Sequence, residues 1–263
     1  MRARSTLFTL YMEFLYPKNR AWVGDLVRWM EALGFSEPAV RAAVSRSTSR
    51  GWLIPEREGR RAYYRLSPRV AWQVKQVRER LYPKDGAQWD GKWRILVYAV
   101  PEDKRSQRDK FRNELVLLGF GTPAPGVWIN PNAKLDAARD LVRFYRLTPY
   151  VELFEAERLT EAAPLELIRK SYHLEEIQKR YRTFLEMPEP AFDALSPQEA
   201  FARLVRLVHE ARKFLFLDPG LPPELTPPGF LGPQALERFL CWRAALYRRA
   251  EPLLHPTLSA ASR

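Results

Sequence analysis

Arginine and serine side chains recur at helical spacing between Ser36 and Gly51, and their types point to nucleic-acid chemistry. A guanidinium can donate two hydrogen bonds to guanine, a serine hydroxyl can bond phosphate or bases, and small residues permit close approach. At roughly 100° per residue, one helix face gathers such side chains. These are Arg41, Ala42, Ser45 and Ser49, with Arg46 on the flank. The pattern predicts a helix face that fits the major groove of DNA.

The opposite face of this helix is small and apolar, which suits packing against other helices. It carries Val40, Ala43, Val44 and Ser47. Ser36 is expected to cap the helix start by accepting from a free backbone N–H, and Gly51 to end the helix in a left-handed conformation. Arg50, near the helix end, is expected to turn back toward the core side and to make a phosphate contact or an intramolecular salt bridge.

A basic hairpin is expected directly after this helix. The β-prone runs Trp52–Ile54 and Ala62–Leu66 flank a segment, residues 55–61, that is turn-like around Gly59. Three arginines near the tip make this segment resemble the wing of a winged helix: Arg57, Arg60 and Arg61. A solvated turn that happens to be basic is the alternative, and the arginine-faced helix before it favours contact with DNA.

Patterns typical of catalysis or metal binding are missing from the sequence. Neither a nucleophile elbow nor a phosphate-cradling glycine loop occurs, and no histidine has a second ligand at a metal-binding spacing. The histidines are His173, His209 and His255. Glu102 and Asp103 follow a predicted strand, where small metal-dependent nucleases sometimes place a carboxylate, although a solvated helix start explains them as well. The sequence therefore does not support an enzyme, and a metal-dependent nuclease is the alternative.

The elements expected around the arginine-faced helix follow the order of a winged helix-turn-helix. A first helix over residues 4–16 precedes a short strand at 21–23 and a second helix that starts at Gly24 and Asp25. After the hairpin, another helix is predicted over residues 68–81. The run Pro83–Gly86 then indicates a domain boundary.

A second unit with alternating strands and helices is predicted beyond this boundary. Strands are expected near 94–100, 127–129 and 150–154, helices near 104–118 and 133–145, and a fourth strand near 120–124. This order suggests a ferredoxin-like α/β sandwich. From residue 159 onward the periodicity predicts helices, one of which starts at Ser196 with Glu199 three residues on.

The expected fold is therefore α+β and multidomain. Residues 1–83 form a winged-helix domain with a linking helix, residues 84–158 a ferredoxin-like middle domain, and residues 159–263 a helical C-terminal domain.

The charge balance favours a polyanionic partner. The 263-residue chain has a net charge of +12, most of it within residues 1–80, and a concentrated positive field attracts nucleic acid or an anionic surface. A compositional bias toward arginine throughout the chain would not concentrate the positive charge in its first third. The single cysteine, Cys241, excludes an intramolecular disulfide and a cysteine-based zinc site. With no signal peptide and no apolar run of membrane-spanning length, a soluble cytoplasmic protein without a membrane partner is expected.

Four long stretches of the sequence are specific enough to compare with known families: LGFSEPAVRAAVSRSTSRGWL with GRRAYYRLS, WDGKWRILVYAVPEDKRSQRDKFRNELVLLGFG, PGVWINP and LVHEARKFLFLDPGLPPELTP. They resemble the PaaX family, repressors of phenylacetic acid catabolism genes. The resemblance covers nearly the whole chain and implies the same three domains. It also implies a homodimer on double-stranded operator DNA that is released by phenylacetyl-coenzyme A, with no cofactor besides this effector. A non-specific nucleoid-type DNA binder is a further alternative.

An acyl-coenzyme A effector is strongly anionic, so its site is expected to offer lysine or arginine beside an apolar slot. Two clusters are candidates: Arg169 with Lys170, and Arg212 and Lys213 with His209. An ordinary exposed helix face is the competing interpretation of each. The chain departs from the family pattern at Ser171–Leu174, where members often read A-W-D-L, and at Ala211, where an aromatic residue is common. If either position touches the effector, the ligand differs.

Overall fold

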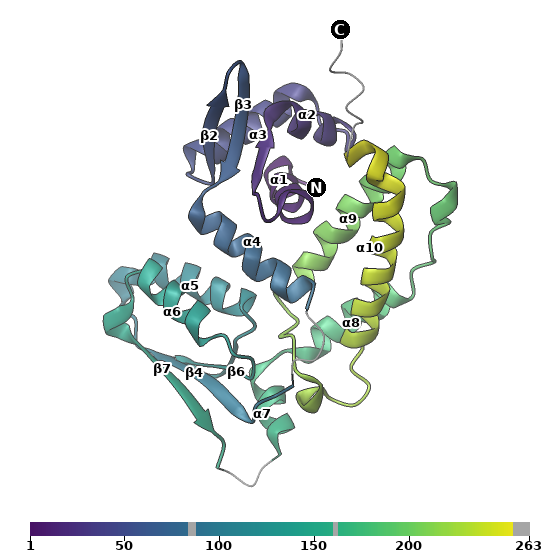
Figure 1. The fold of residues 1–263 in the computed structure, drawn as a ribbon. Helices are drawn as coiled ribbons and strands as arrows, with labels where there is room; N and C mark the ends of the chain where they lie inside the picture. The colour runs from purple at the N-terminus through teal and green to yellow at the C-terminus, as the bar shows by residue number, and fades with distance from the viewer. Residues whose placement is uncertain (84–87, 160–162, 255–263) are drawn as a thin grey trace. The chain divides into compact units, whose positions relative to one another are not determined.

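The computed structural model describes residues 1–83, 88–159 and 163–254 (Figure 1). These residues hold ten α-helices and two antiparallel sheets, so the fold is of the α+β type. None of the helices in this part of the chain is long and apolar enough to cross a membrane. The chain divides into two compact units. The first consists of Met1–Arg78, Pro188–Ala211 and Leu236–Arg263, and the second of Glu79–Met187 and Arg212–Ala235.

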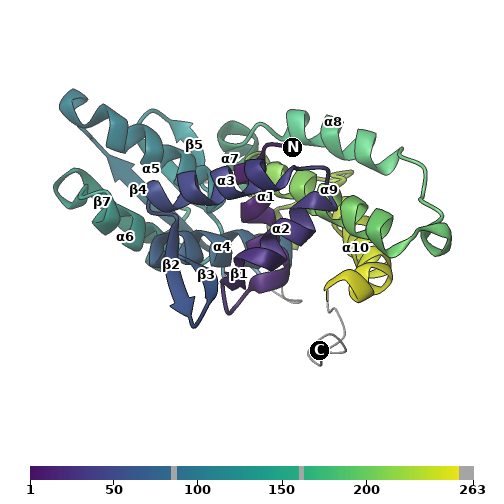
Figure 2. The ribbon, with the colours of Figure 1, turned by 90° about the horizontal axis from the view of Figure 1, so that it is seen from above.

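The first unit begins with helices and a three-stranded sheet of order β1-β3-β2. Its elements are α1 (Ala3–Leu10), the π-helix η1 (Tyr11–Leu15), β1 (Arg20–Trp22), α2 (Val23–Glu31), α3 (Glu37–Ser49), β2 (Leu53–Glu58), β3 (Arg61–Leu66) and most of α4 (Pro68–Leu81). The hairpin β2–β3 projects away from α1, α2 and α3 (Figures 1 and 2). The expected element order is confirmed, as is the pairing of the short strand β1 with the hairpin.

Helix α3 packs through the face that the periodicity predicts. Its buried residues are Val40, Ala43, Val44 and Ser47. At its end, the backbone N–H of Trp52 donates to the carbonyl of Ser47, and that of Gly51 to Thr48, both at 2.9 Å. These two hydrogen bonds end the helix, and Gly51 takes the left-handed backbone conformation, φ +69°, that glycine favours at a helix C-terminus. Ser36 occupies the N-cap position as expected, but its side chain makes no capping hydrogen bond.

Two helices from the C-terminal part of the chain contribute to the first unit. They are α9 (Pro197–Phe214) and α10 (Gly232–Leu254), preceded by the short 3-10 helix η4 (Phe192–Ala194). The ring of Phe14 on η1 packs against Phe201 of α9 and Tyr247 of α10, with ring centroids 5.6 and 6.2 Å apart. Beside it, the buried carboxylate of Glu13 accepts from Nε of Arg243 at 2.7 Å. A buried carboxylate needs such a partner, so this pair fixes η1 against α10.

The start of α9 at Ser196 is confirmed as a capping box. The backbone N–H and the hydroxyl of Ser196 donate to Oε2 of Glu199 at 2.9 and 2.7 Å, and the backbone N–H of Glu199 donates back at 3.3 Å. These hydrogen bonds lower the pKa of Glu199, because they favour its charged form.

The second unit is built around a four-stranded antiparallel sheet of order β5-β6-β4-β7. Its elements are β4 (Lys92–Tyr98), η2 (Glu102–Lys104), α5 (Arg105–Leu117), β5 (Gly121–Ala124), β6 (Val127–Asn130), α6 (Leu135–Phe144), η3 (Thr148–Tyr150), β7 (Val151–Glu157), α7 (Pro164–Ser171), α8 (Leu174–Leu185) and η5 (Pro223–Leu225). Helices α5 and α6 cover one face of the sheet (Figure 1). The three expected strands are confirmed, and β5 is the fourth. The expected boundary at Pro83–Gly86 falls mostly outside the described residues.

A buried tyrosine joins the end of α7 to the sheet. The hydroxyl of Tyr172 donates to the carbonyls of Gly119 and Ile129 at 3.1 and 3.0 Å, and burial raises its pKa. A Cβ added at Gly121 would lie 2.5 Å from the Tyr172 ring, so the strand approaches the ring as closely as only glycine permits. Tyr172 shares its core with Trp93, Ile129, Ile168 and Leu225.

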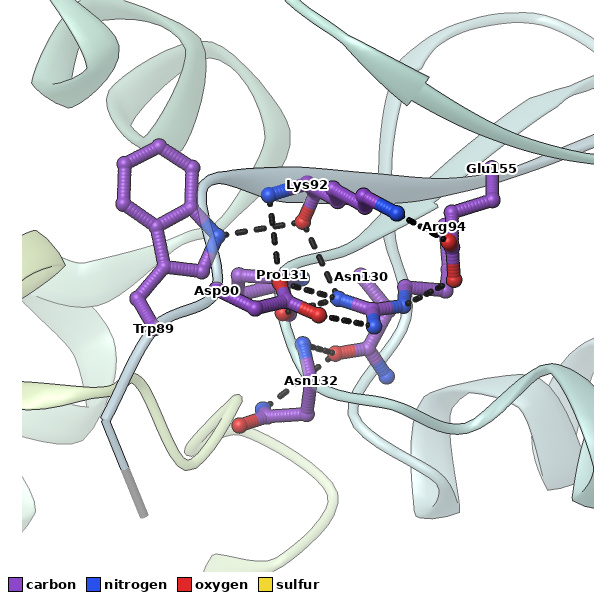
Figure 3. Close-up of polar contacts among 8 residues, drawn as sticks. All are labelled: Trp89, Asp90, Lys92, Arg94, Asn130, Pro131, Asn132 and Glu155. Carbon is purple, nitrogen blue, oxygen red and sulfur yellow. Dashed lines mark hydrogen bonds and ion pairs between the residues drawn. The ribbon is translucent and has the colours of Figure 1, made fainter.

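A buried arginine braces the sheet against the turn that precedes β4 (Figure 3). The side chain of Arg94 is 5% exposed, and its two Nη atoms donate to the carboxylate of Asp90, with Nη1 2.7 Å from Oδ1. Nη1 also donates to the carbonyl of Pro131 at 3.1 Å, and Nε lies 3.3 Å from the carboxylate of Glu155. Hydrogen bonds from Arg94 lower the pKa of Asp90 to about 2. One cation therefore connects β4, the end of β6 and β7.

A second arginine, Arg80 in the last turn of α4, connects two other helix ends. Its Nη1 donates to the carbonyls of Val116 and Leu117, the last residues of α5. Nη1 also donates to the carbonyl of Leu215, just past α9, at 2.9 Å, and Nη2 donates to that of Asp218. Desolvation lowers the pKa of Arg80, but a guanidinium stays charged in proteins.

Replacing Asp90 by asparagine is expected to destabilise the second unit, because the buried Arg94 loses its bidentate carboxylate partner and keeps the single, longer contact with the carboxylate of Glu155. The folded pKa of Asp90, about 2, lies below its ordinary value of 3.8. The stabilisation by the charged Asp90 is therefore complete at pH values above 3.8, its ordinary pKa. It is lost as the pH falls through about 2, its pKa in the folded protein. Urea unfolding of both proteins at neutral pH and at about pH 3 measures the difference, which should be smaller in acid. An equal difference at both pH values would contradict this account.

Replacing Arg80 by methionine keeps much of the side-chain volume and removes all of its donors. The free energy of unfolding is expected to fall by about 2 kcal/mol, because several carbonyls at the ends of α5 and α9 lose their partner. Arg182→Met, at an exposed position of α8, is the matched control and should change stability little. Urea unfolding compares the two variants, and equal stabilities would show that Arg80 is dispensable.

Candidate nucleic-acid interface

The outward face of α3 carries a row of side chains spaced four residues apart. Its members are all exposed: Glu37, Arg41, Ser45 and Ser49. Residues at this spacing are neighbours on a helix surface. Ala42 and Arg46 lie beside the row, the first half-buried and the second exposed. The structure thus places the residues expected to face DNA on one accessible surface and adds Glu37 to them.

Arg41 forms an ion pair with Glu37, which lies one turn earlier on the same helix. Its Nε and Nη2 lie 2.7 and 2.6 Å from Oε1 of Glu37, and 58% and 47% of the two side chains are exposed. Sequence reasoning placed Arg41 but missed Glu37, although the spacing of four residues signals the pair. Because Nε and Nη2 both reach the same oxygen, Nη1 keeps its donors for another acceptor.

Arg50 differs from the expectation. It is the C-cap residue of α3, and its side chain is exposed rather than turned toward the core side. The left-handed turn at Gly51 redirects the chain immediately afterwards, which leaves Arg50 at the surface. Its charge is accessible to a phosphate group.

The hairpin has longer strands and a tighter turn than the sequence indicates. Residues 55–61 were expected to form the turn, but Glu58 pairs with Arg61, which leaves Gly59 and Arg60 as the connection. Gly59 has φ +56°, a conformation that glycine adopts without steric cost. The prediction was wrong at Pro55, which lies within β2. Because β2 is an edge strand, it tolerates a residue without an N–H.

The arginines of the hairpin lie on different faces. Strand alternation places Arg57 on the face of the buried Leu53 and Arg61 on the opposite, outer face. The guanidinium of Arg61 lies 5.1 Å from the ring centroid of Trp22, a cation–π contact. Arg57, Arg60 and Arg61 are all exposed. Because the guanidinium of Arg61 also contacts Trp22, we expect Arg57 and Arg60 to meet phosphate groups more readily than Arg61.

Paired charges neutralise much of the outer face. Arg20 lies 3.9 Å from the ring centroid of Tyr63 and pairs with Glu56 at 2.7 Å and with Glu58 at 2.5 Å. Glu56 also accepts from Arg65 at 2.6 Å. Hydrogen bonds from Arg65, and then from Arg20, lower the pKa of Glu56. The accessible positive charge of the hairpin is consequently concentrated at its tip.

The histidine proposed for the effector site lies in the interior. His209 is 4% exposed on α9, and its Nδ1 lies 3.2 Å from the hydroxyl of Thr9. His209 is therefore a core residue of the first unit and does not share a surface with Arg212 and Lys213. His173 is exposed, and His255 lies outside the described residues.

The other effector candidates lie at two helix ends. Arg169 and Lys170 are exposed in the last turn of α7, and Lys213 is exposed in the last turn of α9, where Arg212 is half-buried. The exposed positions agree with an ordinary helix face, and cations near a helix C-terminus interact favourably with its dipole.

The carboxylates considered for a nuclease lie in the short helix η2, directly before α5. Glu102 pairs with Arg108 at 3.0 Å and with Arg105 at 3.4 Å, and both Glu102 and Asp103 are exposed. Throughout residues 1–83, 88–159 and 163–254, no group of three or more His, Cys, Asp or Glu side chains is arranged to hold a metal ion. The arrangement matches a solvated helix start.

Comparisons with known proteins match all three parts of the chain. The PaaX-like protein family matches residues 2–70, the PaaX protein central Cas2-like domain residues 86–168, and the PaaX-like protein C-terminal domain residues 172–256. Transcriptional repressor PaaX of Escherichia coli (strain K12) is 32% identical over 259 residues, covering 94% of this chain and 80% of that protein. The solved structure of uncharacterized protein Rv0674 from Mycobacterium tuberculosis shares the fold, with a TM-score of 0.59, 23% identity, and coverage of 95% and 98% of the two chains.

An accessible arginine-bearing helix beside a basic hairpin, in a chain similar to a repressor, implies a DNA-binding regulator rather than an enzyme. The chain belongs to the PaaX family of transcriptional repressors.

Arg57→Ala is expected to weaken binding to operator and random DNA alike, and to make the slope of log K against log salt shallower by about 0.9 for one lost phosphate contact. Arg61→Ala removes the same charge, but that guanidinium lies over Trp22, so the salt slope should change less. Fluorescence-anisotropy titrations at several salt concentrations compare the two variants. A larger change for Arg61→Ala would show that the outer face of the hairpin meets DNA.

Proposed function

We propose that this protein is a homodimeric repressor of phenylacetate catabolism genes, which binds operator DNA and is released by phenylacetyl-coenzyme A. The observation that carries the proposal is the exposed row on α3 beside a hairpin with Arg57 and Arg60 at its tip, in a chain 32% identical to a PaaX repressor. A repressor acts where the chromosome is, so the proposal includes a cytoplasmic location.

In this proposal residues 1–83 act as a winged helix-turn-helix with a linking helix. Helices α2 and α3 form the helix-turn-helix, and the sheet of order β1-β3-β2 provides the wing. Helix α3 enters the major groove, where its outward side chains meet base edges. The tip of the wing, with Arg57 and Arg60, then contacts backbone phosphates, as does Arg50.

We assign residues 84–158 to a ferredoxin-like middle domain. Its order β4-α5-β5-β6-α6-β7, with strands arranged β5-β6-β4-β7, supports this assignment. Residues 159–263 are proposed as a helical domain for effector binding and dimerisation. The three proposed domains are consecutive segments of the sequence, whereas each of the two compact units contains residues from more than one of them.

An acyl-coenzyme A effector would need cationic groups for its phosphates. Arg169, Lys170 and Lys213 present exposed cations for this role, whereas His209 is buried against Thr9 and is unsuitable. Within Ser171–Leu174, where the chain departs from the family pattern, the hydroxyl of Tyr172 donates to backbone carbonyls in the core. At Tyr172 the departure therefore affects core packing rather than effector binding.

The Cas2-like description of residues 86–168 favours one alternative, a metal-dependent nuclease. Its candidate carboxylates, Glu102 and Asp103, would have to recruit a metal without a third neighbouring ligand among the described residues. The repressor proposal requires no such assembly.

The test is a gel-shift titration with labelled DNA from upstream of phenylacetate catabolism genes. Binding should exceed that to a scrambled fragment and should be lost on addition of phenylacetyl-coenzyme A, but not of coenzyme A alone. Equal binding to both fragments would indicate a non-specific DNA binder. Cleavage of the labelled DNA with Mg²⁺ or Mn²⁺ that disappears in Glu102→Ala would indicate the nuclease.

A further inference from the structure

One acidic side chain, Glu37, stands in the row of α3 that is proposed to face DNA. It is the first residue of the helix and is 47% exposed. The next positions of the row are Arg41, Ser45 and Ser49, residues that suit phosphate or base contacts. A carboxylate in this row repels phosphate groups, so attraction to the DNA backbone does not explain its presence.

One reason for a glutamate at position 37 is that it stabilises the helix. A negative charge in the first turn interacts favourably with the helix dipole, and a glutamate four residues before an arginine is the favoured order of such a pair. Exposed pairs of this kind contribute little, however. Here the pair also occupies two donor nitrogens of Arg41, Nε and Nη2, within the proposed reading surface.

The geometry of the pair leaves both residues able to contact bases. The contacts from Nε and Nη2 of Arg41 are both to Oε1 of Glu37, and on this exposed side chain Oε2 takes part in neither of them. Nη1 of Arg41 and the second hydrogen of Nη2 can still donate to a guanine. Glutamate accepts from the N4 amino group of cytosine, and arginine donates to O6 and N7 of guanine.

We propose that Glu37 is a specificity-determining residue that accepts from a cytosine amino group at or next to the base pair read by Arg41. The ion pair fixes the positions of the two side chains relative to each other. They therefore act together and recognise a G·C base pair at a defined position. This inference rests on the proposed function, because it requires that α3 faces operator DNA.

The test is competition binding against a panel of operator fragments in which each base pair is changed in turn. Glu37→Ala should lose discrimination at one G·C pair, by about 10-fold or more, while its affinity for random DNA rises because a repelling charge is gone. Glu37→Gln keeps an acceptor oxygen without the charge and should retain part of that discrimination. The affected pair should be the one affected by Arg41→Ala or its neighbour.

Glu31→Ala is the matched control. Glu31 is an exposed acid at the end of α2, so this variant changes the net charge equally without altering the row on α3. It should leave the preference at every base pair unchanged. Circular dichroism of each variant shows whether its overall helix content equals that of the wild-type protein.

Distinct outcomes separate the failure of this inference from failure of the proposed function. A uniform change across the panel in Glu37→Ala, with no position singled out, would mean that Glu37 serves the helix alone. Loss of discrimination far from the pair affected by Arg41→Ala would also overturn the inference. If the wild-type protein shows no preferred fragment, the proposed function fails, and this inference with it.

Discussion

In the second unit, one buried guanidinium, that of Arg80, meets the C-terminal ends of two helices. The last carbonyls of a helix have no partner within it and carry the negative end of its dipole. Arg80 donates to such carbonyls at the ends of α5 and α9. Gly119, which follows α5, lies so close to Pro219 that a Cβ would be 2.6 Å from the proline carbonyl. A side chain at Gly119 would separate these segments, so the glycine allows one arginine to reach both.

In the proposed DNA complex, ion pairs and cation–π contacts distinguish the engaged cations of the hairpin from those expected to meet phosphate groups. Arg20, Arg61 and Arg65 contribute to the positive charge of residues 1–80, yet each is engaged on the outer face of the sheet. Arg57 and Arg60 carry the same charge and are exposed at the hairpin tip. The net charge alone therefore indicates a polyanionic partner, whereas the strand register adds the position at which the proposed function has that partner bind.

The sequence predicts those features that depend on near neighbours in the chain. The buried face of α3, the stop at Gly51 and the capping box at Ser196 follow from contacts within one or two helical turns. Cross-strand pairing decides that Arg61 lies over Trp22 and that the hairpin turn is short, and spacing in one sequence does not reveal that pairing. The contact of Arg80 with Leu215, 135 residues away, is beyond such patterns for the same reason. His209 was misjudged from its basic neighbours, although it lies four residues after the buried Val205 on the inward face of α9.

Affinity and specificity for DNA place opposite demands on a reading helix. Every added cation strengthens binding to all sequences, because the phosphate backbone is uniform. Discrimination needs groups that are satisfied by one base and left unsatisfied by others, and a carboxylate meets this need because it gains only from an amino group and is repelled elsewhere. The ion pair of Glu37 with Arg41 places such a carboxylate beside a donor that suits guanine, on a helix face whose other exposed members are small or basic. In the proposed complex, the residue of the α3 row that is expected to weaken general binding, Glu37, is therefore the one best suited to select a sequence.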